Sequence, residues 1–289
     1  MKKQLLFPLL AAAGGAALFA LRLAQHLTGF EPDTGLPVPG NAAGIVAVVF
    51  LVAVTAALAL LAHRLPAAED TPVFPRDFFT ADTALLTIPV AGVFLMAISG
   101  ILDLLLGAGF LHSGAVELPG IGTVYLFLSD GYAPILHVLM GVCSLASAAG
   151  LFLAVSACRK PTGRVAAPSV DVLWLLLPVV SMVVRLVLTY RAVSVNPALQ
   201  AYYVELLALV MLTLGFYRLA SFAVHAGSPR LFSFYSSTAV MLSVAALADS
   251  GAFLPATLLY AGAAAVLLGF LLLLWSEVPS KPSTEDSTD

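Results

Sequence analysis

Six ionisable residues lie inside or at the edges of long apolar segments, where charge is costly. They are Arg22, Asp103, His137, Arg185, Glu205 and Asp249. A charged side chain at the centre of a membrane span costs about 2.5–3.5 kcal/mol on insertion scales, so residues of this kind are candidates for function by default. All six fall near the same expected face of the membrane. We therefore predict a polar cluster in its outer half.

Arg185 and Glu205 form the strongest candidate pair. The apolar segments that carry them are joined by a short loop, so the two helices should be antiparallel neighbours. Each residue lies ten positions from Val195 in that loop, and both helices rise about 1.5 Å per residue, which places the two side chains at equal depth. We expect an ion pair there. It could orient the helices or form part of a ligand or ion site, unless the arginine extends independently toward water.

The candidate ligand-binding set consists of Arg185, Glu205, Asp103 and His137. His137 is the lone histidine within a span, and haem ligation would need a second axial ligand, usually from another helix. Asp103 and Asp249 stand near the outer ends of their segments, so both could be ordinary helix-end residues. Arg22 is close enough to the surface that extension of its side chain to the interface is its leading explanation.

No motif in the chain specifies a reaction. There is no His-Glu-x-x-His, Cys-x-x-Cys or paired-carboxylate motif for a catalytic metal, no Gly-x-Ser-x-Gly turn for a nucleophilic serine and no phosphate-binding loop. No basic tract suits nucleic acid. We therefore predict no metal, no cofactor and no nucleic-acid partner. An enzyme acting on a lipid-soluble substrate is the least favoured class of function.

The elements that must position these residues are eight long apolar segments. Of the 289 residues, 61% are hydrophobic and only 10% are charged, whereas a soluble domain carries about 25% charged residues. Backbone groups in hydrocarbon must be paired within the chain, which leaves helices or a closed barrel, and the segments lack the period-two alternation of barrel strands. The predicted fold is an all-α, polytopic integral membrane protein with eight transmembrane helices. Its spans are 4–26, 42–63, 83–106, 134–157, 170–190, 199–221, 232–249 and 255–275.

Basic residues predict the orientation of these spans. Ten of the thirteen Lys and Arg residues fall on one side and three on the other, and this bias places the richer side in the cytoplasm. Both termini are then cytoplasmic. Short loops and a Lys-Lys start suit a bacterial inner membrane, whose lipid bilayer is the expected partner. The first span also resembles a secretory signal, although its apolar run is long and no good cleavage site ends it.

A tandem duplication is one interpretation of the spacing. Arg64 and Arg76 are 12 residues apart, as are Arg218 and Arg230, at corresponding places in the two halves. Chance is the other interpretation, because many proteins of this class place Arg at cytoplasmic helix ends. The predicted division is 1–165 and 166–276, two four-helix halves packed as parallel repeats. A disordered cytoplasmic tail, 277–289, would follow them.

The two halves differ most in an apolar, glycine-containing external insert, 107–133. Its composition predicts a folded-back or interfacial element. It could be a functional lid over an external cavity or a structural cap over a wide gap between helices.

Two classes of function remain open at this point. The first is a small-solute or ion carrier, whose outer-leaflet site lies between the halves under that insert. The second is a non-transporting membrane component: a sensor, an assembly factor or the membrane subunit of a larger complex. A carrier should show a polar cavity and broken helices near Arg185, whereas a component should show a closed interior.

Overall fold

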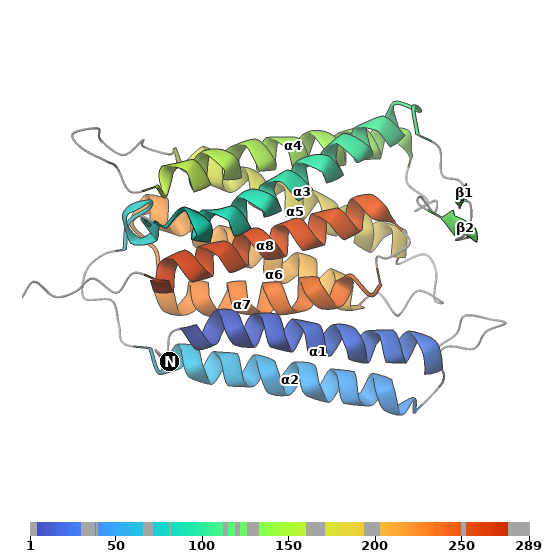
Figure 1. The fold of residues 1–289 in the computed structure, drawn as a ribbon, viewed down its shortest axis with the longest axis horizontal. Coiled ribbons are helices and arrows are strands. Elements are labelled where there is room, and N and C mark those ends of the chain that lie inside the picture. Colours follow the sequence, from blue (N-terminus) through green and yellow to red (C-terminus); the bar gives the residue numbers. More distant parts are fainter. Residues whose placement is uncertain are drawn as a thin grey trace, which may run out of the picture.

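A computed structural model describes residues 5–29, 38, 40–65, 72–80, 82–111, 115–118, 122–125, 133–159, 171–193, 203–249 and 253–276. Within them, eight long helices make up almost the whole molecule (Figure 1). These are α1 Leu6–Thr28, α2 Ala42–His63, α3 Thr83–Gly107, α4 Pro134–Ala157, α5 Val172–Val193, α6 Tyr203–Ser221, α7 Pro229–Ala246 and α8 Leu254–Ser276. The shorter elements are η2 Arg76–Phe78, η4 Phe222–Val224 and the strands β1 Ala115–Leu118 and β2 Gly122–Tyr125.

The prediction of a multi-pass helical membrane protein is confirmed. Seven of these helices are long and apolar enough to cross a membrane. The remaining one, α7, carries four serines and a threonine, and most of its side chains are buried by other helices. Because α7 has little contact with lipid, it can carry hydroxyl groups that a lipid-facing helix would not tolerate.

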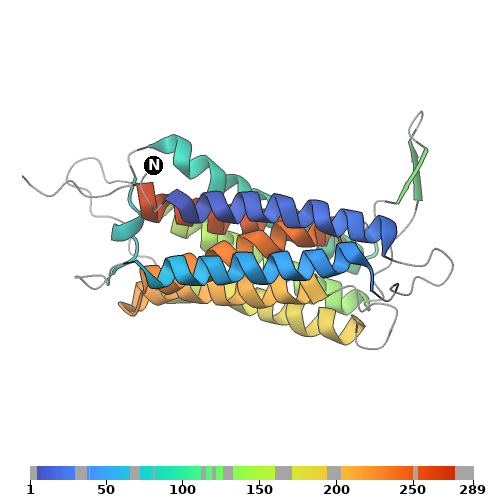
Figure 2. The same ribbon diagram turned by 90° about the horizontal axis from the view of Figure 1, so that it is seen from below.

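Six of the helices form a closed ring. From α3 to α8 each helix packs on the next, and α8 closes the ring against α3. The hairpin of α1 and α2 packs outside this ring, mainly on α7 (Figures 1 and 2). We call the end of the bundle where α1, α3, α5 and α7 finish the polar end. The opposite end, which carries Arg64, Arg159 and Arg218, is the basic end.

Glycines let α3 approach both of its neighbours closely. A Cβ atom on Gly92 would lie 2.6 Å from the carbonyl oxygen of Gly262 in α8, and one on Gly141 of α4 would lie 2.8 Å from that of Gly100. Small residues allow such contacts between membrane helices. Farther toward the basic end, α3 stays against α8, because Pro89 fills the space beside Gly269. Helix α3 therefore leans from α8 toward α4 along its length.

The predicted division into halves 1–165 and 166–276 stays a prediction. Helices of the first predicted half pack directly on helices of the second, since α1 and α2 lie on α7 and α3 lies on α8. The duplication itself stays a prediction. The predicted tail, 277–289, lies outside the described residues.

Within the external insert, 107–133, the chain folds back on itself. The strands β1 and β2 pair antiparallel, with Val116 opposite Val124. Whether this hairpin serves as a lid or a cap stays a prediction, because its side chains lie outside the described set.

Candidate functional site

Three of the four predicted site residues meet at the polar end, inside the helix ring. Arg185 of α5 donates a hydrogen bond through Nη2 to Oδ2 of Asp103 in α3. His137 of α4 places Nδ1 3.5 Å from Oδ1 of the same carboxylate. All three side chains are buried. We call Asp103, His137 and Arg185 the Asp103 cluster.

The local sequence of α5 explains why Arg185 faces inward. Ser181 and Thr189 lie four residues before and after it, so the three residues share one face of the helix. All three are buried, whereas the opposite face of α5 exposes apolar side chains such as Val180 and Val187. The helix turns its polar stripe toward the ring interior and its apolar face outward.

Glu205, the fourth predicted residue, lies beside this cluster with a different partner. Its Oε1 accepts a hydrogen bond of 2.8 Å from the hydroxyl of Tyr260 in α8. It lies in the first turn of α6, where the helix dipole favours an anion. Glu205 is also close enough to Arg185 and Asp249 to interact with their charges.

The expected ion pair between Arg185 and Glu205 is wrong in its partner. The carboxylate that Arg185 binds is Asp103. Equal depth was the basis of that expectation, and depth does not fix the rotation of a helix about its axis. Helix α5 packs on α4 as well as on α6, and Arg185 binds the carboxylate on α3.

A second group at the polar end was not predicted. Arg22 of α1 donates through Nη2 to Oδ1 of Asp249, just after α7, at 2.6 Å, and Nε2 of His26 lies 2.6 Å from the same oxygen. Gln25 accepts a further hydrogen bond from Arg22 at 2.6 Å, and the ring of Tyr203 lies 5.1 Å from its guanidinium carbon. We call Arg22, His26 and Asp249 the Asp249 cluster.

The interpretation of Arg22 as a side chain that extends to the interface is wrong, because its exposed fraction is 0%. The sequence held a usable signal. Arg22 and His26 are four residues apart and therefore share one face of α1. A helix face with two such groups inside a membrane protein requires an anion, and Asp249 provides it.

The described groups at the polar end do not balance in charge. Asp103, Asp249 and Glu205 supply three buried carboxylates, while Arg22 and Arg185 supply two guanidinium groups. Two histidines, one in each cluster, could carry a proton. Among the described residues, no set of three or more His, Cys, Asp or Glu side chains is placed to hold a metal ion.

The pocket that the structure describes lies elsewhere. It is a groove at the basic end, lined by α3 and by Arg159, so the polar cavity expected beside Arg185 is not part of it. Pro89 and Pro178 lie inside α3 and α5, and both helices continue through them. The carrier's expected cavity and broken helices near Arg185 therefore stay a prediction, since both proline-containing helices are continuous where the structure describes them.

Comparison with known proteins finds no matching family model, no similar curated protein and no similar solved structure. The architecture alone shows a membrane-embedded, multi-pass helical protein. Any finer statement about function must come from the geometry of the polar end.

Proposed function

We propose that the protein is a small-solute or ion carrier whose transport step is linked to a proton bound at Glu205. The observation that carries this proposal is the difference between the three buried carboxylates. Asp103 and Asp249 each bind a guanidinium group, whereas the described hydrogen-bond partner of Glu205 is the neutral hydroxyl of Tyr260. Of the three carboxylates, Glu205 is the one whose described hydrogen-bond partner carries no charge.

A buried, unbalanced carboxylate is costly enough to demand a cation. Removing an isolated charge from water costs several kcal/mol even after the protein relaxes. The connecting segments 30–39, 112–132, 194–202 and 250–252 contain no Lys or Arg, and His112 is their one histidine. The further arginine at this end, Arg191, is exposed at the end of α5.

A proton is the occupant that fits this site best. A bare metal cation would need a cage of several oxygen ligands, and the described side chains provide no such set. A proton needs no such set of ligands, only a carboxylate oxygen that can bind it. Chains of Asp, Glu and His within a membrane are the residues that proton-linked transporters use.

Infrared difference spectroscopy tests the proton directly, without knowledge of the solute. A protonated carboxyl group has a C=O stretch that shifts on deuteration, and this band should be present at neutral pH in the wild type. Glu205→Gln keeps the acceptor for Tyr260 and should remove the band. The matched control is Asp77→Asn at the basic end, where the carboxylate accepts a backbone hydrogen bond from Val73. A wild type without the band, or a Glu205→Gln variant that keeps it, would refute the assignment.

Transport is tested in vesicles that contain a pH-sensitive dye. A panel of amino acids, carboxylic acids, sugars and alkali cations is added outside, and the internal pH is recorded. At least one member should move protons with the wild type and with Asp77→Asn, and none should do so with Glu205→Gln. If the wild type leaves the internal pH unchanged for the whole panel, the carrier proposal fails even where the protonated carboxyl is present.

Several titratable or charged groups surround Glu205 and can influence its proton. They are Arg22, His26, Asp103, His137, Cys143, Arg185, Tyr203, Asp249 and Tyr260.

A second candidate is a non-transporting membrane subunit, and the α1–α2 hairpin favours it. Only 17% of the most apolar stretch of α2 is buried by the rest of the protein. Apolar side chains on this helix, such as Val49 and Val52, are more than half exposed. Replacing both valines with Trp should leave a carrier active. The same change should separate a subunit from its complex, as measured by the size of the particle extracted in mild detergent.

A further inference from the structure

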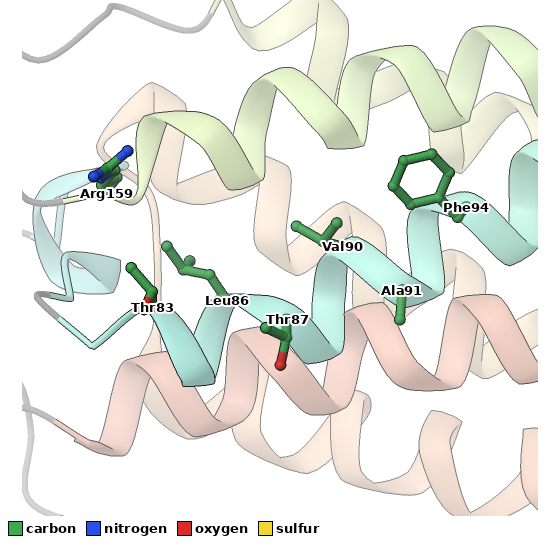
Figure 3. Close-up of a pocket in the computed structure, with 7 residues that line it drawn as sticks. All are labelled: Thr83, Leu86, Thr87, Val90, Ala91, Phe94 and Arg159. Carbon is green, nitrogen blue, oxygen red and sulfur yellow. The ribbon is translucent and has the colours of Figure 1, made fainter.

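A groove on the surface of α3 lies at the basic end, far from both polar clusters. Its volume is about 430 Å³. Figure 3 shows Arg159 at one end of the groove and Phe94 at the other, with Leu86 and Val90 directed toward α4. The lining residues are Thr83, Leu86, Thr87, Val90, Ala91, Phe94 and Arg159.

The lean of α3 creates this groove. Near the polar end α3 touches α4, because Gly107 allows the backbone of Pro134 to approach closely. Toward the basic end α3 stays with α8 through Pro89 and Gly269. The two helices α3 and α4 therefore separate like the sides of a wedge (Figure 1). The open side of the wedge lies at the basic end, beneath Arg159.

The length of the groove matches one leaflet of a bilayer. Thr83 and Phe94 are 11 residues apart, which corresponds to about 16 Å along a helix. Half of the hydrocarbon thickness of a bilayer is about 15 Å. Between these two residues the lining is apolar except for Thr87, whose hydroxyl donates a hydrogen bond to the carbonyl of Ala84. The groove therefore has the length and the lining that suit an acyl chain running from the interface to the midplane.

At its interfacial end the groove is lined by Arg159, the one charged residue among its lining side chains. Arg159 is exposed there, and the chain beneath it is fixed by a hydrogen bond of 3.0 Å from the amide of Thr80 to the carbonyl of Cys158. Arg76, also exposed, lies four residues before Thr80. Two acids lie near this end in the sequence, and each accepts a backbone hydrogen bond: Asp77 from the amide of Val73 at 2.7 Å and Asp82 from the amide of Ala84 at 2.9 Å.

We propose that this groove binds one anionic glycerophospholipid of the surrounding bilayer. One acyl chain lies along α3 from Thr83 to Phe94, and the phosphate accepts charge-assisted hydrogen bonds from Arg159. Basic residues at the mouth of a cleft between membrane helices recognise acidic headgroups in this way. The proposal is independent of the proton at Glu205, since it uses the other end of the molecule.

Native mass spectrometry tests the proposal with phosphatidylglycerol and phosphatidylcholine of identical acyl chains. The wild type should retain phosphatidylglycerol more strongly. Arg159→Gln should weaken its retention by about tenfold, as expected for the loss of a hydrogen bond to a charged group, and bring it close to that of phosphatidylcholine. Ala91→Phe fills the groove and should reduce the retention of both lipids. Both substituted residues are exposed, so neither variant disturbs the packing between helices.

Two matched control variants distinguish lipid binding in the groove from a general attraction of acidic lipids to the basic end. Arg64→Gln removes an exposed base at the same end, on α2, and Val52→Phe adds the same ring to a lipid-facing position outside the groove. Both should bind phosphatidylglycerol like the wild type, and soluble glycerophosphoglycerol should not compete. The proposal is overturned if Arg159→Gln or Ala91→Phe binds as the wild type does, if Arg64→Gln loses as much as Arg159→Gln, or if the free headgroup displaces the lipid.

Discussion

The Asp103 cluster and the Asp249 cluster use the same three residue types in different surroundings. The Asp103 cluster lies inside the helix ring and is closed from all sides. The Asp249 cluster joins the external α1–α2 hairpin to the ring, and a third of the His26 side chain is exposed there. The same combination of Asp, His and Arg thus links helices within the ring in the Asp103 cluster and attaches α1 to the ring in the Asp249 cluster.

In both clusters the arginine comes from one predicted half of the sequence and the aspartate from the other half. Arg22 lies on the first helix of the first predicted half and binds an aspartate after the third helix of the second half. Arg185 lies on the first helix of the second half and binds Asp103, near the end of the third helix of the first half. Exchange of this kind is what a tandem duplication would produce. The surrounding helices do not repeat it, since α1 lies outside the ring and α5 within it.

The largest predicted difference between the clusters follows from the removal of each arginine. Arg185→Met should lower the free energy of unfolding by about 3–5 kcal/mol, because it leaves Asp103 buried without its counter-charge. Arg22→Met should cost about 1–3 kcal/mol, since His26 remains 2.6 Å from Asp249. Thermal and denaturant unfolding in detergent measure both values. Equal losses would contradict the predicted difference between the clusters, and a reversed order would show that the Asp249 cluster contributes more to stability.

Removal of both charges of a pair should reverse most of this loss. Apolar replacement of a buried ion pair is often neutral or stabilising, so Arg185→Met with Asp103→Leu should unfold within about 1 kcal/mol of the wild type. The corresponding double variant, Arg22→Met with Asp249→Leu, should recover less, because His26 and Gln25 each lose a contact of 2.6 Å, whereas His137 loses a carboxylate oxygen 3.5 Å away. Equal recovery in the two double variants would remove the distinction between the clusters.

Much of the architecture, and the depth of the polar residues, could be predicted from the sequence. Hydropathy locates the spans because length and apolarity alone decide whether a helix can cross a bilayer. The predicted and observed ends differ by up to a few residues, as for the seventh span, predicted as 232–249 and observed as Pro229–Ala246. Helix α7 is mostly buried by protein, so hydropathy marks its ends less sharply than those of a lipid-facing helix.

The partners of the charged residues could not be predicted in the same way. Position along a helix gives depth, but the choice between Asp103 and Glu205 as the partner of Arg185 depends on how α5 is rotated in the ring. The Asp249 cluster required knowledge that α1 packs on α7, a contact between segments more than 200 residues apart. Nothing in the local sequence around Arg22 encodes that contact.

Glu205 connects the two clusters, and its hydroxyl partner provides the next smaller test. Tyr260→Phe removes the donor and should destabilise the protein by about 1–2 kcal/mol, the cost of leaving a buried acceptor without its bond. The infrared band of the protonated carboxyl should remain and shift in frequency, because the carboxyl loses a hydrogen bond. The control is Tyr217→Phe, whose side chain is half exposed. A vanished band in Tyr260→Phe would mean that Glu205 is ionised and holds no proton.

The smallest change in the free energy of unfolding should come from Gln25, which contacts only one of the two clusters, the Asp249 cluster. Gln25→Leu removes a hydrogen bond of 2.6 Å to Arg22, at a partly exposed position in the penultimate turn of α1. The expected cost is about 0.5–1 kcal/mol, because water reaches this end of α1 and Arg22 keeps its bond to Asp249. The free energy of unfolding of Gln25→Leu is measured together with that of Ser181→Ala. Ser181 lies on the same face of α5 as Arg185, so the pair compares a neighbouring polar residue in each cluster. A loss from Gln25→Leu as large as that from Arg22→Met would mean that Gln25, rather than Asp249, fixes the arginine in place.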